Sequence, residues 1–225
     1  MKIIITEEQL KLIVENENKN LIDLTDVYES GVSPNKLDGM FEHINNKKGG
    51  KYDGYYIDGD VNLYKSDVTE LKYLVKVGGY LDLEISQIKS LPNLIKVGGD
   101  LNLAETGIKT LPLLERVDGN FYFRDSDIIS IPNLVSVGRG VNGDVSGIKY
   151  LPKLESVGAD NDDELYGDDL TLWWSGITEL PSLKYVNGSL SLGGSPLGKE
   201  LNASGMTNVE INDKFGVQGK LFIWK

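Results

Sequence analysis

The hydrophobic and polar positions of this chain recur with a fixed period of 20 residues. Residues 91–110 (LPNLIKVGGDLNLAETGIKT) are followed directly by a second copy of the same pattern at 111–130 (LPLLERVDGNFYFRDSDIIS). A valine column repeats the spacing at Val77, Val97, Val117, Val137 and Val157. A period of this length is typical of solenoids, in which each repeat forms one turn and neighbouring turns stack.

Within each repeat, two apolar residues separated by one polar residue predict a short strand. The pairs are Val61/Leu63, Leu81/Leu83, Leu101/Leu103, Phe121/Phe123, Leu170/Leu172 and Leu190/Leu192. Residues two apart in a strand share a face, so each pair is expected to point into the core. Further apolar columns follow at fixed distances. For one repeat we therefore expect Leu103, Ile108, Leu111 and Leu114 to be buried and Asn102 to be exposed.

Two polar columns indicate how the chain turns. A hydroxyl follows each apolar pair by three residues: Ser66, Ser86, Thr106, Ser126, Ser146, Ser175 and Ser195. Such a hydroxyl is expected to bond to the backbone where the chain leaves the strand. A glycine precedes most strands by two residues: Gly59, Gly79, Gly99, Gly119, Gly188 and Gly219. We expect these glycines to provide a tight turn with positive φ.

The pattern L-x-L-x-x-[ST]-x-I-x-x-L-P-x-L resembles a leucine-rich repeat of the shortest, 20-residue class, with Ser or Thr in place of the usual asparagine. The fuller form V-G-G-D-L-x-L-x-x-T-x-I-x-x-L-P is similar to repeats of bacteriophage and bacterial proteins. The resemblance covers roughly residues 55–201. It implies a leucine-rich-repeat solenoid with a parallel sheet on the concave face, few or no helices in the repeats, and a phage-encoded origin.

One repeat departs from the pattern, because Gly143 occupies a core column. We therefore expect the core layer at Gly143 to be locally thin.

The chain divides into three parts. Residues 1–50 lack the repeat and are expected to form a small helical N-terminal cap over the first turn, or alternatively a separate docking segment. A capping box at residues 6–9 (TEEQ) opens a helix to about Asn16, and Ser33 and Pro34 open a second helix to about Ile44. Residues 51–201 hold the repeats. Residues 202–225 form a closing segment with a last strand near Leu221.

An acidic insertion interrupts the repeats at about 158–169. With the preceding Glu155, the acids of this region are Asp160, Asp162, Asp163, Glu164, Asp168 and Asp169. Oxygen-rich loops can bind calcium, which leaves a calcium site and a solvated loop as the two interpretations. The sixth position from Asp160 is Leu165 rather than the glycine of a helix-loop-helix calcium site. We therefore predict a solvated loop and no metal site.

Composition excludes several function classes. The net charge of −11, from 23 basic and 34 acidic residues, argues against binding to nucleic acid or an anionic membrane. There is no cysteine and one histidine, His43, so cysteine nucleophiles and His-rich zinc sites are not expected. The glycine pairs belong to the repeat and do not form a phosphate loop. We predict no catalytic residue, no cofactor and no enzyme activity.

No segment has the apolar length of a membrane span, and two glutamates interrupt the first apolar run, so neither membrane insertion nor a signal peptide is expected. With the resemblance, this predicts a location in the host cytoplasm or in a virion.

The outward-facing strand residues form the candidate site. Acids and aromatics gather there, and Tyr and Trp dominate protein interfaces. The predicted protein-binding residues are Tyr64, Asp82, Glu84, Asp100, Asn102, Tyr122, Arg124, Asp144, Thr171 and Trp173. Of the adjacent Trp173 and Trp174, one is expected to pack and the other to be exposed.

This surface predicts non-enzymatic recognition of a protein with a basic patch. A solvated face with incidental aromatics is the alternative interpretation of the surface. The alternative function is a structural or decoration component of a virion, attached to capsid or tail proteins.

Overall fold

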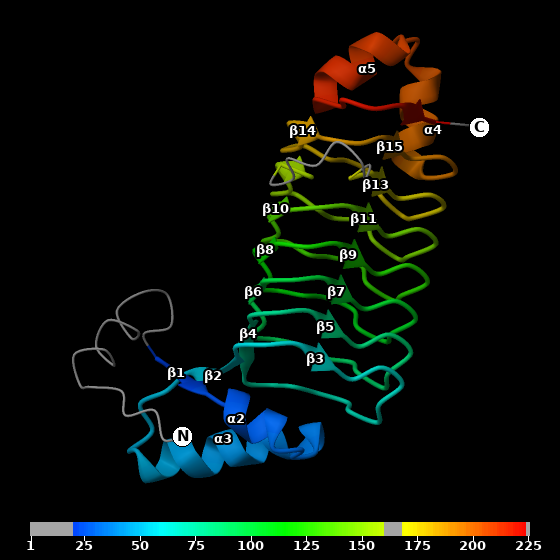
Figure 1. Ribbon diagram of the computed structural model, residues 1–225. Coiled ribbons are helices and arrows are strands. Elements are labelled where there is room, and N and C mark those ends of the chain that lie inside the picture. The colour runs from blue at the N-terminus through cyan, green and yellow to red at the C-terminus, as the bar shows by residue number, and fades with distance from the viewer. Residues whose placement is uncertain (1–19, 160–167, 224–225) are drawn as a thin grey trace, which may run out of the picture.

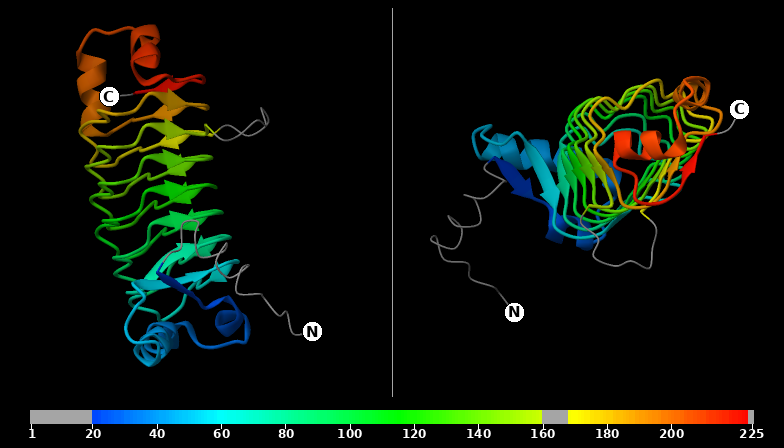
Figure 2. Two further views of the ribbon diagram at one scale, coloured as in Figure 1. Left: turned by 90° about the vertical axis from the view of Figure 1, so that its left-hand side faces the viewer. Right: turned by 90° about the horizontal axis from the view of Figure 1, so that it is seen from above.

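The computed structural model describes residues 20–159 and 168–223 and shows a parallel β-solenoid closed by helices at both ends (Figure 1). Stacked turns about 20 residues long contain few helices, which confirms the fold class predicted from the period. Viewed down the stack, successive turns lie over one another (Figure 2, right).

Each turn contributes two strands, so the described residues form two eight-stranded parallel sheets. Sheet A contains, in spatial order, β1 (Leu21–Asp23), β2 (Gly54–Ile57), β4 (Leu74–Val77), β6 (Lys96–Val97), β8 (Arg116–Val117), β10 (Ser136–Val137), β12 (Ser156–Val157) and β14 (Tyr185–Val186). Sheet B contains β3 (Val61–Asn62), β5 (Leu81–Asp82), β7 (Leu101–Asn102), β9 (Phe121–Tyr122), β11 (Val141–Asn142), β13 (Leu170–Thr171), β15 (Leu190–Ser191) and β16 (Leu221–Phe222).

The apolar pairs predict the position of sheet B but not the existence of sheet A. Most sheet A strands have only two residues, with the valine column facing inward, and two residues are too few to show alternation in the sequence.

The register between turns is constant. Leu101 pairs with Phe121, and Val97 pairs with Val117. Across the insertion, Val141 pairs with Leu170 at a separation of 29 residues, so the additional residues leave sheet B in register. Residues 160–167, which carry most of the predicted acidic loop, lie outside the described residues.

The core follows the apolar columns. Leu103, Ile108, Leu111 and Leu114 are fully buried, as predicted. Asn102 is only half-exposed, because its amide donates to Glu84 Oε2 at 3.1 Å.

The layer at Gly143 is not thin, contrary to the prediction. A Cβ built on Gly143 would contact the ring of Phe123 and lie 2.9 Å from Leu172 Cδ2, so the aromatic side chain of the preceding turn fills this space.

The hydroxyl column acts at the corners, as predicted, from Thr106 onward, whereas the hydroxyls of Ser66 and Ser86 have no hydrogen-bond partner among the described residues. The Thr106 hydroxyl donates to Leu103 O at 2.7 Å, and the Ser126 hydroxyl donates to Phe123 O at 2.6 Å. The residue before each of the first six hydroxyls has positive φ, although none of these residues is glycine. They are Lys65, Ile85, Glu105, Asp125, Val145 and Trp174. A left-handed backbone is unfavourable for β-branched residues such as Ile85, so the turn geometry overrides local preference.

The glycine column has a different role from the one predicted. Gly79, Gly99 and Gly119 do not have positive φ. A Cβ on Gly99 would instead lie 2.8 Å from both Gly79 C and Tyr80 N. Glycine is needed here because the backbones of successive turns approach too closely for any side chain.

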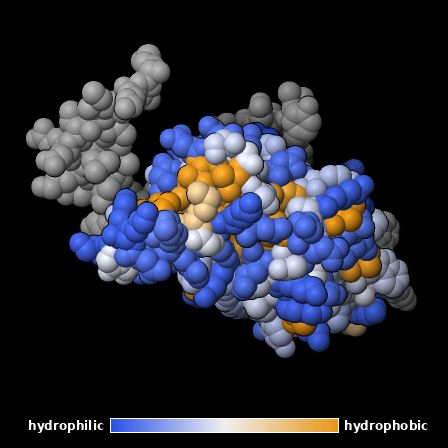
Figure 3. All heavy atoms as spheres, turned by 90° about the horizontal axis from the view of Figure 1, so that it is seen from below, coloured by the Kyte–Doolittle hydropathy of each residue, from blue (hydrophilic) through white to orange (hydrophobic). Residues whose placement is uncertain are grey.

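The N-terminal cap contains α2 (Thr25–Glu29), the 3-10 turn η1 (Pro34–Lys36) and α3 (Leu37–Lys47). The second predicted helix is therefore present, whereas the predicted helix at residues 6–16 lies outside the described residues. Phe41 of α3 is buried, and its ring lies 6.0 Å from that of Tyr55. Figure 3 views the molecule from the cap end, where hydrophobic patches interrupt a mostly hydrophilic surface.

Polar contacts join the cap to the first turn. Tyr28 of α2 protects the open edge of β3, because its hydroxyl accepts from Asn62 N–H at 3.1 Å and lies 3.4 Å from Asn62 O. Asp38 of α3 accepts from the Tyr55 hydroxyl at 3.1 Å and from Lys72 N–H at 2.7 Å. Burial first, and then the charge and hydrogen bond of Asp38, raise the pKa of Tyr55, which keeps its hydroxyl protonated.

The C-terminal end carries α4 (Pro196–Ala203) and α5 (Asn208–Phe215), neither of which the sequence analysis predicted. Thr207 and Glu210 form a capping box for α5, and Gly216 ends it in a left-handed conformation. Ile211 and Phe215 are buried over the last turn. The expected last strand is present as β16, which pairs with β15.

Truncation of a core leucine tests this register. Leu103→Ala should lower the free energy of unfolding by about 2–5 kcal/mol, because it leaves a cavity in a packed layer. Leu113→Ala is the control, since Leu113 is 40% exposed and should change stability by about 0.5 kcal/mol or less. Urea unfolding of both variants measures the difference, and equal stabilities would contradict the assigned core.

Candidate binding surfaces on the two sheets

The outer face of sheet B, called here the sheet B face, carries the predicted binding residues. One polar side chain per strand points outward, and parallel strands place these side chains about 4.8 Å apart. The column consists of Asn62, Asp82, Asn102, Tyr122, Asn142 and Thr171, and it ends at Ser191, which is buried. Each of the ten predicted residues is exposed or half-buried.

Two adjoining depressions lie along this face. The first, of about 180 Å³, is lined by Tyr80, Leu81, Asp82, Asp100, Asn102 and Tyr122. The second, of about 330 Å³, is lined by Glu84, Asn102, Ala104, Tyr122, Arg124 and Asn142. Asn102 and Tyr122 border both. The structure thus brings six predicted residues together, whereas Tyr64, Asp144, Thr171 and Trp173 lie outside the two depressions.

The aspartates of this face also accept backbone hydrogen bonds. Asp100 Oδ1 accepts from Asn120 N–H at 2.6 Å, which links two turns. Asp144 Oδ1 accepts from Trp173 N–H at 2.7 Å. Asn120 lies one turn after Asp100 and has the same role, because its Oδ1 accepts from Gly140 N–H at 3.1 Å. At the position of Asp100 the fold therefore uses an oxygen acceptor, and an asparagine supplies it without the negative charge.

Tyr122 stands between the two depressions. Burial first, and then the negative charge of Asp100, raise the pKa of Tyr122, and the positive charge of Arg139 opposes them. The hydroxyl therefore stays protonated at neutral pH and can donate a hydrogen bond. Arg124 lines the second depression. Its only ion pair among the described residues is a loose one, with Arg124 Nη2 3.9 Å from Glu105 Oε1.

Of the two adjacent tryptophans, one is half-buried and one exposed, as predicted. Trp173, from the predicted set, is half-buried, whereas Trp174 is 67% exposed. Trp174 lies at a corner with a φ of 54°, where strand alternation ends. A Cβ on Gly194 would lie 2.6 Å from the Trp174 ring, so this glycine lets the next turn pass beside the indole. Alternation rules could not identify Trp174, because it follows the strand.

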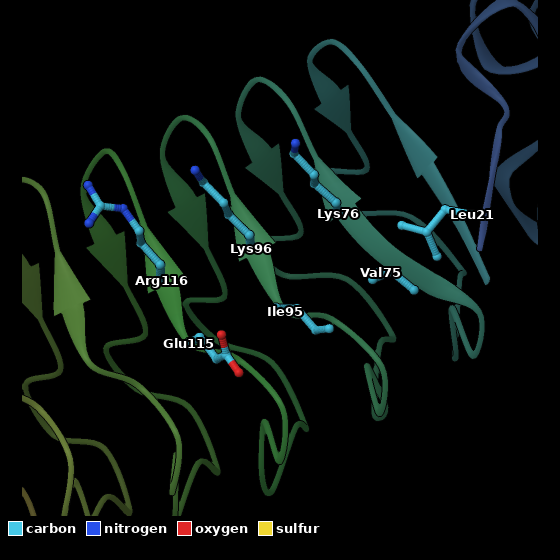
Figure 4. A pocket seen from close by; sticks show the side chains of 7 residues that line it. All are labelled: Leu21, Val75, Lys76, Ile95, Lys96, Glu115 and Arg116. Atoms are coloured by element: carbon cyan, nitrogen blue, oxygen red, sulfur yellow. The ribbon is translucent and has the colours of Figure 1, made fainter. Parts of the chain in front are cut away.

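A second surface, missed by the sequence analysis, lies on the outer face of sheet A. Lys76, Lys96 and Arg116 point outward from successive strands in one row (Figure 4). The row borders a groove of about 390 Å³, which we call the sheet A groove (Figure 4). The groove is lined by Leu21, Val75, Lys76, Ile95, Lys96, Glu115 and Arg116. It continues into a hollow of about 330 Å³ lined by Asn20, Leu21, Asp53, Val75, Asn93, Ile95 and Leu113.

Asp118 connects the basic row to its neighbours. Its carboxylate lies 3.1 Å from Lys96 Nζ and also pairs with Arg116. Burial raises the pKa of Asp118, but the hydrogen bonds and positive charges of Arg116 and Lys96 outweigh that effect and lower it overall. The carboxylate stays charged at neutral pH and holds two cations of the row in place.

The part of the chain that the structure describes contains no group of three or more His, Cys, Asp or Glu residues arranged to hold a metal ion. His43 is exposed on α3. Within residues 20–159 and 168–223, no helix has both the length and the apolar character needed to cross a bilayer.

Comparison with known proteins found no matching family model, no similar curated protein and no similar solved structure.

Two substitutions separate the structural role of Asp100 from its charge. Asp100→Ala should lower the free energy of unfolding by about 0.5–1.5 kcal/mol, because the Asn120 N–H loses its acceptor. Asp100→Asn should change it by about 0.5 kcal/mol or less, since the amide oxygen can accept the same bond. Urea melts of both variants test this, and equal losses would show that the charge itself stabilises the fold.

Proposed function

We propose that this protein is a non-enzymatic recognition module whose sheet B face binds a protein partner with a basic patch. The observation that carries the proposal is the excess of negative charge on that face. Asparagine satisfies the equivalent backbone donors in other turns, at Asn62 and Asn120, yet Asp82 and Asp100 are acidic, and Glu84 and Asp144 add negative charge to the same face. Charge that the fold does not require is available for a partner.

The arrangement suits a basic partner physically. Regularly spaced acids on a rigid scaffold raise association rates by attracting the opposite charge. The scaffold orders the outward columns before binding, which reduces the entropy lost on association. The two depressions are of a size to receive side chains, and Tyr122 presents an aromatic group between them. A lysine or arginine of the partner could stack on this ring beside Asp100.

The repeat sequences add an expectation about origin. Their resemblance to leucine-rich repeats of phage and bacterial proteins supports a phage-encoded binder that acts on a host protein. The virion alternative has no structural observation of its own, and the identity of a captured partner distinguishes the two.

The test compares matched variants against one purified partner, captured from a lysate of the source cells. In surface plasmon resonance, Asp82→Asn combined with Asp100→Asn should slow association, and the slowing should shrink as salt screens the charges. Tyr122→Ala should mainly raise the dissociation rate, with a loss of about 2 kcal/mol or more if Tyr122 is a hot spot.

Glu70→Gln combined with Glu179→Gln is the control, because it removes the same charge from exposed positions outside both sheets. Its kinetics should match the wild type. Binding that is unchanged in all the sheet B variants would contradict the proposal. Retained binding to capsid or tail proteins would favour the structural role.

A further inference from the structure

The sheet A groove has an apolar floor that is only partly covered. Leu21, Val75 and Ile95 are half-buried, and they line both the groove and the hollow that continues it. Val75 and Ile95 occupy the same position in successive turns, so they lie side by side along the axis of the stack (Figure 4). A ligand that covered this floor would remove apolar area from water, which favours binding.

The fold does not require the basic row beside this floor. The parallel register stacks Lys76, Lys96 and Arg116 at intervals of about 4.8 Å, and like charges in such a position repel one another. Ser136 and Ser156 occupy the same position in the next two turns and keep the same register without any charge. Cations that the fold does not need, held against one another, favour a ligand with negative charge.

Apolar and basic side chains run along the groove in two adjacent lines. Val75 directly precedes Lys76, and Ile95 directly precedes Lys96, so an aliphatic side chain lies beside a cation in two successive turns (Figure 4). In the third turn the exposed Glu115 takes the place of the aliphatic residue and gives that end of the groove a negative charge. A fitting ligand therefore needs an apolar line with acids along one side of it.

We propose that the sheet A groove binds an amphipathic helix of a partner protein, with acidic residues along one edge of the helix's apolar face. The basic row spans two strand intervals, or about 9.6 Å. Acids at i, i+4 and i+7 of a helix share one side and span about 10.5 Å. The long side chains of Lys76, Lys96 and Arg116 can absorb a difference of about 1 Å.

The length of the groove also suits a helix. From β1 to β8 the groove crosses four strand intervals, or about 19 Å, which corresponds to about 13 helical residues. An extended peptide fits the row less well, because three of its same-face side chains span about 13 Å. This second surface goes beyond the proposed function, since it lies on the other sheet and selects a partner of opposite charge.

Two synthetic helical peptides and the full-length protein test the proposal by fluorescence anisotropy. The acidic-edge peptide carries leucine at every third or fourth position and three glutamates along one edge of the leucine stripe. The control peptide has the same composition, with its glutamates moved to the face opposite the leucines. At low salt the acidic-edge peptide should bind at least about threefold more tightly, because only its glutamates reach the basic row.

Charge variants identify the surface that is bound. Lys76→Gln combined with Lys96→Gln should weaken binding of the acidic-edge peptide by about 2- to 30-fold, the loss expected for two exposed ion pairs. Lys89→Gln combined with Lys149→Gln is the matched control, because both lysines are exposed and lie outside the groove. Glu115→Gln should have the opposite effect and tighten binding by up to about fivefold, since it removes a charge that repels the glutamates.

A further pair of variants tests the apolar floor. Ile95→Ala should weaken binding of both peptides by about fivefold or more, because each peptide keeps its leucine stripe. Val135→Ala is the control, since Val135 lies in the same column two turns later, is 41% exposed and does not line the groove. The charge variants change only half-buried or exposed side chains, so the test does not depend on the stability of Ile95→Ala.

Four results would overturn the proposal. Equal affinities of the two peptides would show that the basic row does not select acids on the helix edge. An equal loss in the Lys89/Lys149 variant would show unspecific attraction. If neither peptide binds, phosphatidylglycerol vesicles whose binding requires Lys76 and Lys96 would assign the groove to a lipid surface. Self-association that requires the same two lysines, again without peptide binding, would assign it to a second copy of the chain.

Discussion

The structure depends on the close contact between the backbones of successive turns. Two parallel ladders hold equivalent residues in register, and at Gly99 the approach is so close that a Cβ would lie 2.8 Å from Gly79 C. The other features follow from this contact. Outward side chains form straight columns, oxygens such as that of Asp100 reach an N–H of the next turn, and the corners adopt positive φ even at Ile85. An insertion is tolerated only where it leaves the strands on either side in register.

The period and the apolar columns were enough to predict the fold class and the core layer around Leu103, because burial in a repeated turn imposes a repeated hydrophobic pattern. Features set by contacts between turns could not be predicted from one repeat. The role of Gly99 was misassigned, because its neighbour in space lies 20 residues away. Sheet A was missed, because its two-residue strands carry no detectable alternation. In the candidate site, alternation identified Tyr122 and Asp100 but not Trp174, which follows the strand at a corner.

The two outer faces differ in chemistry because different columns face outward. The sheet B face presents acids and aromatics, whereas the sheet A groove has an apolar floor beside Lys76, Lys96 and Arg116. Both faces sit on one rigid stack whose ends are covered by helices. Rigidity favours binding, since a preorganised surface loses less entropy on association. The two proposals therefore rest on separate columns and can succeed or fail independently.

The unfolding free energies of Gly99→Ala and Gly107→Ala test the central claim, the close contact between turns, most directly. Both changes restrict the unfolded chain equally. A Cβ on Gly107 would have ordinary contacts, the nearest at 3.6 Å, whereas a Cβ on Gly99 would overlap the adjacent backbone. Urea melts should show a loss of about 1–3 kcal/mol or more for Gly99→Ala, and a change within about 1 kcal/mol for Gly107→Ala. Equal stabilities of the two variants would contradict the account.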